Sequence, residues 1–204
     1  MDIDQVLKEK TYKRFLDKPI QPNQLSSIID AGMHVHGAGN IISWHFLIID
    51  SEKVKKDLLP YCYNQRWMLQ APVWVMVLVS TEESNKFFKE KAESFGKQDA
   101  MMAIQNMRLK AASFKVGSYL IRSFKEPEIK DVLRIPEDLI LEGIIVLGHP
   151  KGIGQSISRY RTDQVISFNR FGARKIDSLF PLKKSISEAW SKVKRSLKKK
   201  DVTP

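Results

Sequence analysis

The segment HGAGNIISWHF, residues 36–46, concentrates unusual chemistry at the junction of two predicted elements. It places two glycines, two histidines, an asparagine and a tryptophan within eleven residues. Three uses of such a segment compete: a metal site built on the histidines, a glycine loop that cradles a phosphate, or a backbone turn that lies against a flat ligand. The elements that flank the segment decide among them.

The flanking elements are a helix and then a strand. Apolar residues recur at helical spacing over residues 22–33, and residues 44–49 alternate with the period of a buried strand. A dinucleotide-binding loop needs the reverse order, and KGIGQ at residues 151–155 lacks the Lys-Ser/Thr of a phosphate loop. His34 and His36 face opposite ways in an extended chain, which argues against a metal site. What remains is a glycine turn that approaches a ligand, or a plain helix-to-strand turn.

Further helices and strands are predicted on both sides of this segment. Residues 4–14 carry apolar positions typical of a first helix, and Ser51 is placed to cap a short helix that ends at Leu59. Residues 72–80 form a strand too apolar to leave either face in water. Residues 98–114 form a long helix that is apolar over more than one stripe, which predicts a central position or a subunit interface.

The remaining pattern completes a mixed α and β chain. A short strand is predicted at residues 118–121, a helix after Pro127, and a strand at residues 143–148. The strands are separated by 20 residues or more along the chain, which excludes a sheet of simple hairpins.

Most of the net positive charge lies at the C-terminal end. The formal net charge is +11, and residues 183–204 hold eight Lys or Arg against two acidic residues. Apolar residues recur there at helical spacing, which predicts a basic amphipathic helix over residues 181–204, separate from a domain of residues 1–180. Such a helix docks on its own fold or a partner subunit, or it binds a membrane surface or nucleic acid.

The composition is that of an ordinary globular protein. The 204 residues are 43% apolar, enough to bury a core, and the longest apolar run, residues 71–79, is too short to cross a membrane. The charged start has no apolar leader, so we expect a cytoplasmic protein without a membrane anchor. A single cysteine, Cys62, excludes an internal disulfide framework.

Five motifs follow one another in an order that resembles the nitroreductase family, from about residue 4 to residue 172. EKTYKRF (residues 9–15) is similar to the family's Arg-Arg-Ser-x-Arg-x-Phe, and VHGAGNIISWHF (35–46) to its Ala-Pro-Ser-Ala-Gly-Asn-x-Gln-Pro-Trp-His-Phe. NQRWMLQAPVWVMV (64–77) is similar to its Asn-Gln-x-Trp-x-x-x-Ala-Pro. AIQNMRLKAASFKVGS (103–118) resembles the central helix with its Gly-Leu-Gly end, and the residues from 135 to 172 resemble the closing strand and arginine-containing tail. Each motif alone is weak, whereas five in order are strong.

The resemblance implies a fold and an activity. The expected fold is α+β, with a central, mostly antiparallel sheet flanked by helices, in an intertwined homodimer with two FMN sites at the interface. The expected activity is a ping-pong transfer of hydride or electrons from NADH or NADPH, through FMN, to a small organic acceptor such as a quinone, nitroaromatic or enone. The flavin carries the chemistry, so no catalytic side chain is expected.

The resemblance also implies the residues that bind FMN. The N-terminal set meets the phosphate and the ring edge, the turn lies along the flavin from the opposite subunit, and the tail arginines meet the phosphate. In chain order the cofactor-binding residues are Lys10, Thr11, Lys13, Gly37, Ala38, Asn40, Asn64, Val116, Gly117, Arg159 and, as a fallback for Arg159, Arg161. Within a helix, Lys10, Lys13 and Arg14 would share one basic face. Trp44 and Trp74 are interpreted as core residues rather than as flavin-stacking groups.

Several positions depart from the family pattern. Glu9 stands at the first phosphate arginine, and Lys115 at the first glycine of Gly-Leu-Gly. Gly37, Ile42 and Ser43 replace the usual serine, glutamine and proline. Three hypotheses follow: an FMN-dependent oxidoreductase, a homologue of the same fold that binds a ligand without turnover, and a basic nucleic-acid-binding protein.

Overall fold

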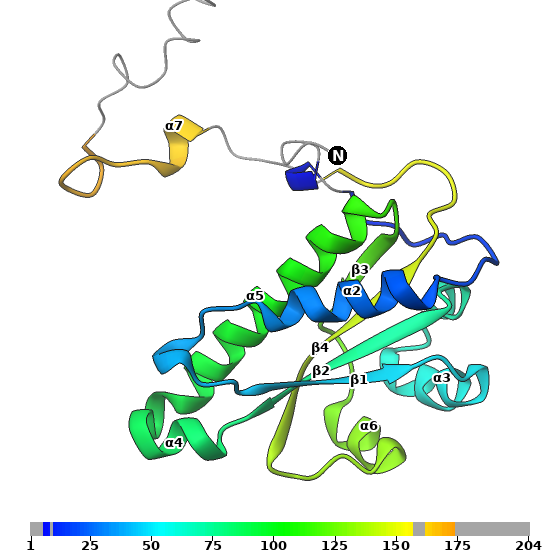
Figure 1. The fold of residues 1–204 in the computed structure, drawn as a ribbon, viewed down its shortest axis with the longest axis horizontal. Coiled ribbons are helices and arrows are strands. Elements are labelled where there is room, and N and C mark those ends of the chain that lie inside the picture. The colour runs from blue at the N-terminus through cyan, green and yellow to red at the C-terminus, as the bar shows by residue number, and fades with distance from the viewer. Residues whose placement is uncertain (1–5, 9, 157–161, 174–204) are drawn as a thin grey trace, which may run out of the picture. The chain divides into compact units, whose positions relative to one another are not determined.

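The computed structural model describes residues 6–8, 10–156 and 162–173 (Figure 1). The chain divides into two units, Met1–Ile157 and Ser158–Pro204, and each is described by itself. The described part of the second unit holds one short helix, α7 (Thr162–Val165). The predicted basic helix of residues 181–204, and with it the predicted boundary at residue 180, lies outside the described residues.

A four-stranded antiparallel sheet forms the centre of the first unit. In spatial order its strands are β1 (Trp44–Ile49), β2 (Val73–Ser80), β4 (Leu139–Gly148) and β3 (Gly117–Ile121). The predicted antiparallel sheet is confirmed. Strand β4 begins four residues before the predicted strand of residues 143–148, because Glu142 interrupts the apolar run without interrupting the strand. The Glu142 carboxylate is paired with Arg122 of the neighbouring connection at 3.5 Å.

Helices cover both faces of this sheet (Figure 1). Helices α2 (Pro22–Met33) and α5 (Ala92–Ser113) lie on one face, and α3 (Glu52–Leu58) and α6 (Glu126–Leu133) lie on the other. Helix α4 (Glu82–Phe88) leads into α5, and short 3-10 helices complete the unit: η2 (Leu59–Cys62), η3 (Arg66–Gln70) and η4 (Lys89–Lys91). The predicted α+β class is confirmed. No helix in the described part of the chain is long and apolar enough to cross a membrane.

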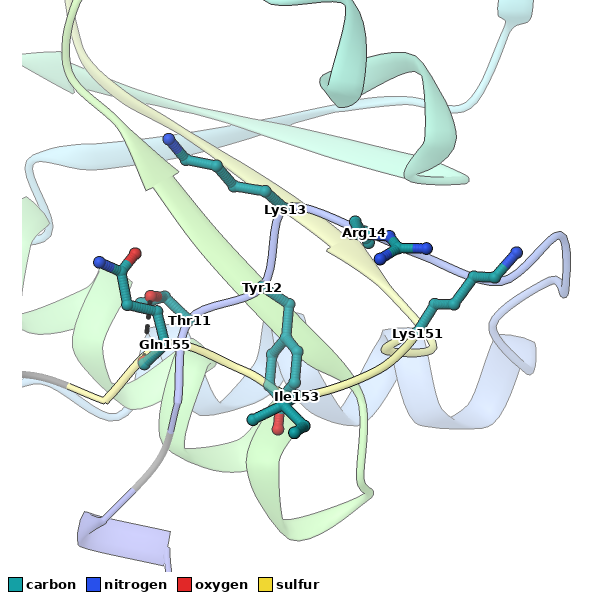
Figure 2. Close-up of a pocket in the computed structure, with 7 residues that line it drawn as sticks. All are labelled: Thr11, Tyr12, Lys13, Arg14, Lys151, Ile153 and Gln155. Carbon is teal, nitrogen blue, oxygen red and sulfur yellow. Dashed lines mark hydrogen bonds between the residues drawn. The ribbon is translucent and has the colours of Figure 1, made fainter.

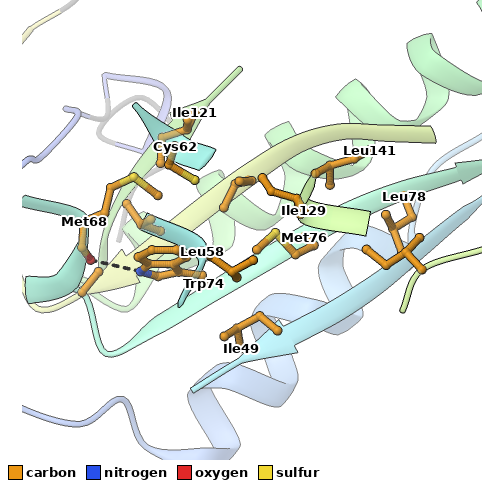
Figure 3. Close-up of a cluster of buried hydrophobic side chains, with 14 of the residues drawn as sticks. Ile49, Leu58, Cys62, Met68, Trp74, Met76, Leu78, Ile121, Ile129 and Leu141 are labelled. Carbon is orange, nitrogen blue, oxygen red and sulfur yellow. Dashed lines mark hydrogen bonds between the residues drawn. The ribbon is translucent and has the colours of Figure 1, made fainter. Parts of the chain in front are cut away.

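Strand β2 divides its side chains between two cores. Val73, Val75, Val77 and Val79 pack toward α2 and α5. Trp74, Met76 and Leu78 pack into the other core with Leu58, Ile129 and their neighbours (Figure 3). All seven side chains are buried, so the prediction that neither face of this strand meets water is confirmed. The interpretation of Trp44 and Trp74 as core residues is also confirmed, since both are buried.

Helix α5 is longer than predicted. It begins at Ala92 rather than at residue 98, because its first turns are polar outside and carry small residues inside. Gly96 is one of these: a Cβ there would lie 2.6 Å from Val79 Cγ1. The glycine therefore permits a close approach of the helix to the sheet, a packing role that outweighs its poor helix propensity.

The predicted first helix of residues 4–14 is wrong for residues 10–14. Only Val6 and Leu7 are helical among its described residues, and the chain is extended from Lys10 onward. The Tyr12 amide donates to the Ser118 carbonyl at 3.2 Å, and the Leu16 amide to the His149 carbonyl at 2.8 Å. The β3 and β4 ends thus supply hydrogen bonds that local sequence does not reveal. The predicted basic helical face of Lys10, Lys13 and Arg14 does not form.

Candidate functional site

The glycine turn is a single 3-10 turn, η1 (Ala38–Asn40), between α2 and β1. Gly39 and Asn40 both have positive φ, at 62° and 55°. Glycine adopts this conformation without strain, and asparagine tolerates it better than most residues. The positive φ values of the turn therefore explain why glycine and asparagine occupy positions 39 and 40.

Asp99 of α5 holds this turn in place. Its buried carboxylate accepts a hydrogen bond from the Ala38 amide at 3.0 Å. A Cβ on Gly37 would lie 2.7 Å from Asp99 Oδ2, so the glycine that replaces the family's serine leaves room for this carboxylate. Asp99 was not among the predicted site residues. A signal was available, because Asp99 is a carboxylate next to Ala100 in a helix segment that was recognised as apolar on several sides.

Burial raises the pKa of Asp99 above its ordinary value, and the Ala38 amide only partly opposes this. The folded chain therefore binds the Asp99 carboxyl proton more tightly than the unfolded chain does. The contribution of Asp99 to the free energy of unfolding falls as pH rises from the ordinary aspartate pKa through the raised pKa of the folded state. Asp99→Asn keeps an oxygen acceptor and removes the titration. We expect the stability of the variant relative to the parent to rise from about pH 4 and then level off, as measured by urea unfolding. Parallel pH profiles would contradict a buried, titrating Asp99.

A second group of predicted residues lies where the N-terminal segment crosses the end of the sheet. Thr11 and Gln155 exchange backbone hydrogen bonds at 3.1 and 2.9 Å. The segment borders a hollow of about 160 Å³, whose lining includes the basic side chains of Lys13, Arg14 and Lys151 (Figure 2). Arg14 and Lys151 extend in the same direction, whereas Lys13 points the opposite way (Figure 2). Lys151 was not predicted as a site residue, because it is far from Lys13 and Arg14 in the sequence and only the fold brings it to the same hollow.

Glycines allow this segment to pack closely. A Cβ on Gly117 would lie 2.9 Å from Tyr12 Cδ2, and one on Gly154 would lie 2.5 Å from Tyr12 Cε1. The tyrosine ring thus accounts for Gly154 of KGIGQ, which has a packing role. Val116 is buried, and its amide donates to the Ala111 carbonyl at 2.9 Å in the C-terminal cap of α5. Lys115, between the helix and Val116, has φ of 58°, a conformation that the family's glycine adopts without strain.

Lys13 contacts two aromatic rings. Its ammonium lies 5.5 Å from the centroid of Trp67 and 5.1 Å from that of Tyr119. Trp67 follows Asn64, a predicted site residue that is exposed and has φ of 54° in the turn after η2. The fold therefore brings the segments of Thr11 and Lys13, of Asn64, and of Val116 and Gly117 to one place. Lys10 begins the same extended segment and is exposed, whereas Arg159 and Arg161 lie outside the described residues.

The two groups of predicted residues lie toward opposite ends of α5 (Figure 1). The glycine turn is bonded to Asp99, near the start of the helix, and the second group surrounds the strand that follows Ser113. The 14 residues between these positions span about 21 Å at 1.5 Å per residue. One chain thus carries two separate groups of predicted residues, which we name the turn half-site (residues 37–40) and the segment half-site (residues 10–13, 64–67 and 116–119).

The cysteine and histidines show no reactive grouping. Burial raises the pKa of the Cys62 thiol to about 11, so it is protonated at neutral pH. His34 lies on the surface 3.3 Å from Asp30, within its own helix turn. In residues 6–8, 10–156 and 162–173, no three His, Cys, Asp or Glu side chains are grouped to hold a metal ion.

The four-stranded antiparallel sheet and its two helical layers define an α+β protein with the nitroreductase fold. The sequence model of the Nitroreductase family matches residues 7–66 and 60–149, and the chain belongs to this family. It is 25% identical over 147 residues to an Archaeoglobus fulgidus protein named as a candidate NADH dehydrogenase/NAD(P)H nitroreductase. The aligned region covers 70% of this chain and 81% of the relative.

Solved structures show the same fold. A nitroreductase family protein from Clostridium novyi is 24% identical, with a TM-score of 0.69 over 88% of this chain and 99% of that one. The NADPH:FMN oxidoreductase from Vibrio harveyi, complexed with NAD+, is 18% identical, with a TM-score of 0.76 over 96% of this chain and 90% of that one.

Proposed function

We propose that this protein is an FMN-dependent oxidoreductase that takes electrons from NADH or NADPH and passes them to a small organic acceptor. One observation carries the proposal: in a nitroreductase-family chain, the fold brings together the predicted N-terminal residues, the segment of Asn64 and Trp67, and the start of β3. When bound, FMN supplies a ring that accepts a hydride and gives up electrons, so donor and acceptor use one place in turn.

The described residues fit FMN in their chemistry. Lysine ammonium groups and a threonine hydroxyl are suitable donors to a phosphate, and aromatic rings suit a flat ring system. Lys10 and Thr11 would hold the phosphate, together with Arg159 from outside the described residues. Gly37 and Ala38 would contribute partly exposed backbone from the turn half-site, and the exposed Asn40 would contribute its side-chain amide.

The separation of the half-sites supports a homodimer. Asp99, which holds the turn half-site, and Ser113, which precedes the segment half-site, are about 21 Å apart along α5. We infer that each ligand lies between the turn half-site of one copy and the segment half-site of a second copy. An apolar groove between α2 and the edge strand β1, lined by Leu25, Ile29, Met33 and Ile48 among others, offers surface for that second copy. Met33 and Ile48 are more than 40% exposed in the single chain.

The proposal is tested by the colour of the purified protein. We expect a yellow preparation that releases FMN on heating, and loss of the visible flavin bands when NADH or NADPH is added under nitrogen. The acceptor class is then assigned by comparing reoxidation with a quinone, a nitroaromatic and an enone. A colourless protein that fails to bind added FMN would overturn the proposal.

Binding without turnover is the second candidate. Ile42, where the family has glutamine, is 60% exposed beside the turn and offers no hydrogen bond to a flavin. A protein that binds FMN but whose flavin is not bleached by either nicotinamide would support this candidate. The nucleic-acid hypothesis depends on the basic C-terminal residues, which lie outside the described chain.

A further inference from the structure

The KGIG loop (residues 151–154) is held at both of its ends by the N-terminal segment. The Lys151 amide donates to the Arg14 carbonyl at 2.9 Å, and the Gln155 amide donates to the Thr11 carbonyl at 2.9 Å. A loop that is fixed at both ends presents its side chains and its backbone from a defined position, as a binding site requires. The role of this loop is therefore a question that its packing against the segment does not exhaust.

Two cations extend in the same direction from this frame. Arg14 and Lys151 line the hollow of about 160 Å³, and both side chains extend away from Lys13 (Figure 2). The described lining of the hollow includes no carboxylate, and neither Arg14 nor Lys151 forms an ion pair with another described residue. Both positive charges are therefore available to an anionic ligand, and a phosphate is bound best by cations that approach it together.

The KGIG loop adds backbone donors and an apolar side chain. Gly152 has φ of 82°, and the amides of Gly152 and Ile153 donate no hydrogen bond to any residue in the described part of the chain. Backbone amides in a turn of this kind can form an anion-binding concavity. Ile153 also lines the hollow and is 95% exposed, so it offers apolar surface beside the charges. A phosphate that carries a nucleoside suits this combination better than inorganic phosphate does.

We propose that Arg14, Lys151 and the KGIG loop bind a phosphate monoester other than that of the flavin, namely the 2′-phosphate of NADPH. This inference rests on the proposed function, and it narrows the electron donor from NADH or NADPH to NADPH. The 2′-phosphate is at the adenosine end of the donor, far from the nicotinamide, so its site has to lie outside the place where the nicotinamide meets the flavin. The two cations meet this condition because they extend away from Lys13, a residue of the proposed FMN site (Figure 2).

A binding experiment tests this inference without turnover. Binding of adenosine 2′,5′-bisphosphate and of 5′-AMP, which lacks the 2′-phosphate, is measured by isothermal titration calorimetry for the parent, Arg14→Met, Lys151→Met and the double variant. We expect the parent to bind the bisphosphate roughly 10-fold more tightly than 5′-AMP, and this advantage to fall by about 3-fold in each single variant. The advantage should disappear in the double variant, and in the parent it should shrink as salt is added.

A second readout is the donor preference in steady-state kinetics. The ratio of kcat/KM for NADPH to kcat/KM for NADH should exceed 1 in the parent and fall about 10-fold in Arg14→Met/Lys151→Met, because only NADPH carries the 2′-phosphate. The change should appear in KM for NADPH rather than in kcat, since the 2′-phosphate takes no part in hydride transfer. Lys53→Met is the matched control and should leave the ratio unchanged, because Lys53 is an exposed lysine on α3 that does not line the hollow.

Three results would overturn the inference. Equal affinity of the parent for the bisphosphate and for 5′-AMP would mean that the 2′-phosphate is not recognised. Competition by inorganic phosphate as effective as that by the bisphosphate would indicate a general anion site only. A double variant that loses affinity for FMN but not for riboflavin would assign the hollow to the flavin phosphate. Failure of the proposed function looks different: the parent then holds no flavin and oxidises neither donor, whatever the calorimetry shows for the bisphosphate.

Discussion

Heterodimers built from two flavin-free variants should recover about half of the wild-type FMN content if, as proposed, each site combines half-sites from two chains. The first variant, Gly37→Val, damages the turn half-site, since a Cβ there would lie 2.7 Å from Asp99 Oδ2. The second, Lys10→Glu/Lys13→Glu, damages the segment half-site by placing two carboxylates beside the flavin and its phosphate. In each homodimer, each of the two sites then contains one damaged half-site and one intact half-site.

In the heterodimer, one site combines both damaged halves and the other combines both intact halves. Losing two charge-assisted contacts should weaken FMN binding by roughly 100-fold or more in the Lys10→Glu/Lys13→Glu homodimer, and the displaced turn should empty the Gly37→Val homodimer, so the recovered flavin is easily measured. The two chains carry different tags and are co-expressed, the heterodimer is isolated with both tags in sequence, and its flavin is measured by absorbance after heat release.

Two controls accompany this experiment. Differently tagged copies of the same variant should give a flavin-free dimer, and a wild-type chain paired with either variant should carry one flavin per dimer. If each site lay within a single chain, the mixed heterodimer would remain empty while the dimer with one wild-type chain would still hold one flavin. That combination would contradict shared sites.

Trp74→Ala should lower the free energy of unfolding by about 3–5 kcal/mol, the largest single-residue effect on stability that we expect. Trp74 is fully buried on β2, and its indole nitrogen donates to the Met68 carbonyl at 3.0 Å. The substitution leaves a cavity between β2 and the helices of that face, and it also leaves the Met68 carbonyl without this donor (Figure 3). Urea unfolding followed by far-UV circular dichroism gives the loss.

Phe87→Ala is the matched control, because this aromatic side chain is 71% exposed on α4. Its removal should change the free energy of unfolding by no more than about 0.5 kcal/mol. Trp74→Phe should be intermediate, since it retains ring packing and loses the hydrogen bond. Similar losses for Trp74→Ala and Phe87→Ala would contradict the position assigned to Trp74 in the core.

Periodicity predicted the elements whose apolar pattern is continuous. The helix of residues 22–33, the Ser51 cap and the strands around Trp74 follow the prediction, because burial imposes a period of 3.6 or 2 on the residues themselves. The helix prediction for the N-terminal segment failed because the positions of Tyr12 and Phe15 do not distinguish a helical period from a strand period. Its extended form depends on hydrogen-bond partners more than 100 residues away.

The sequence by itself determined the family, the α+β class and the glycine turn between a helix and a strand, since these depend on residue types and their order. The tertiary structure alone decided three features of the site. Asp99 meets the turn, Lys151 meets the N-terminal segment, and Trp67 and Tyr119 meet Lys13 through contacts between residues far apart in the chain. The length of α5 then separates the two half-sites, a geometric fact that no local pattern expresses.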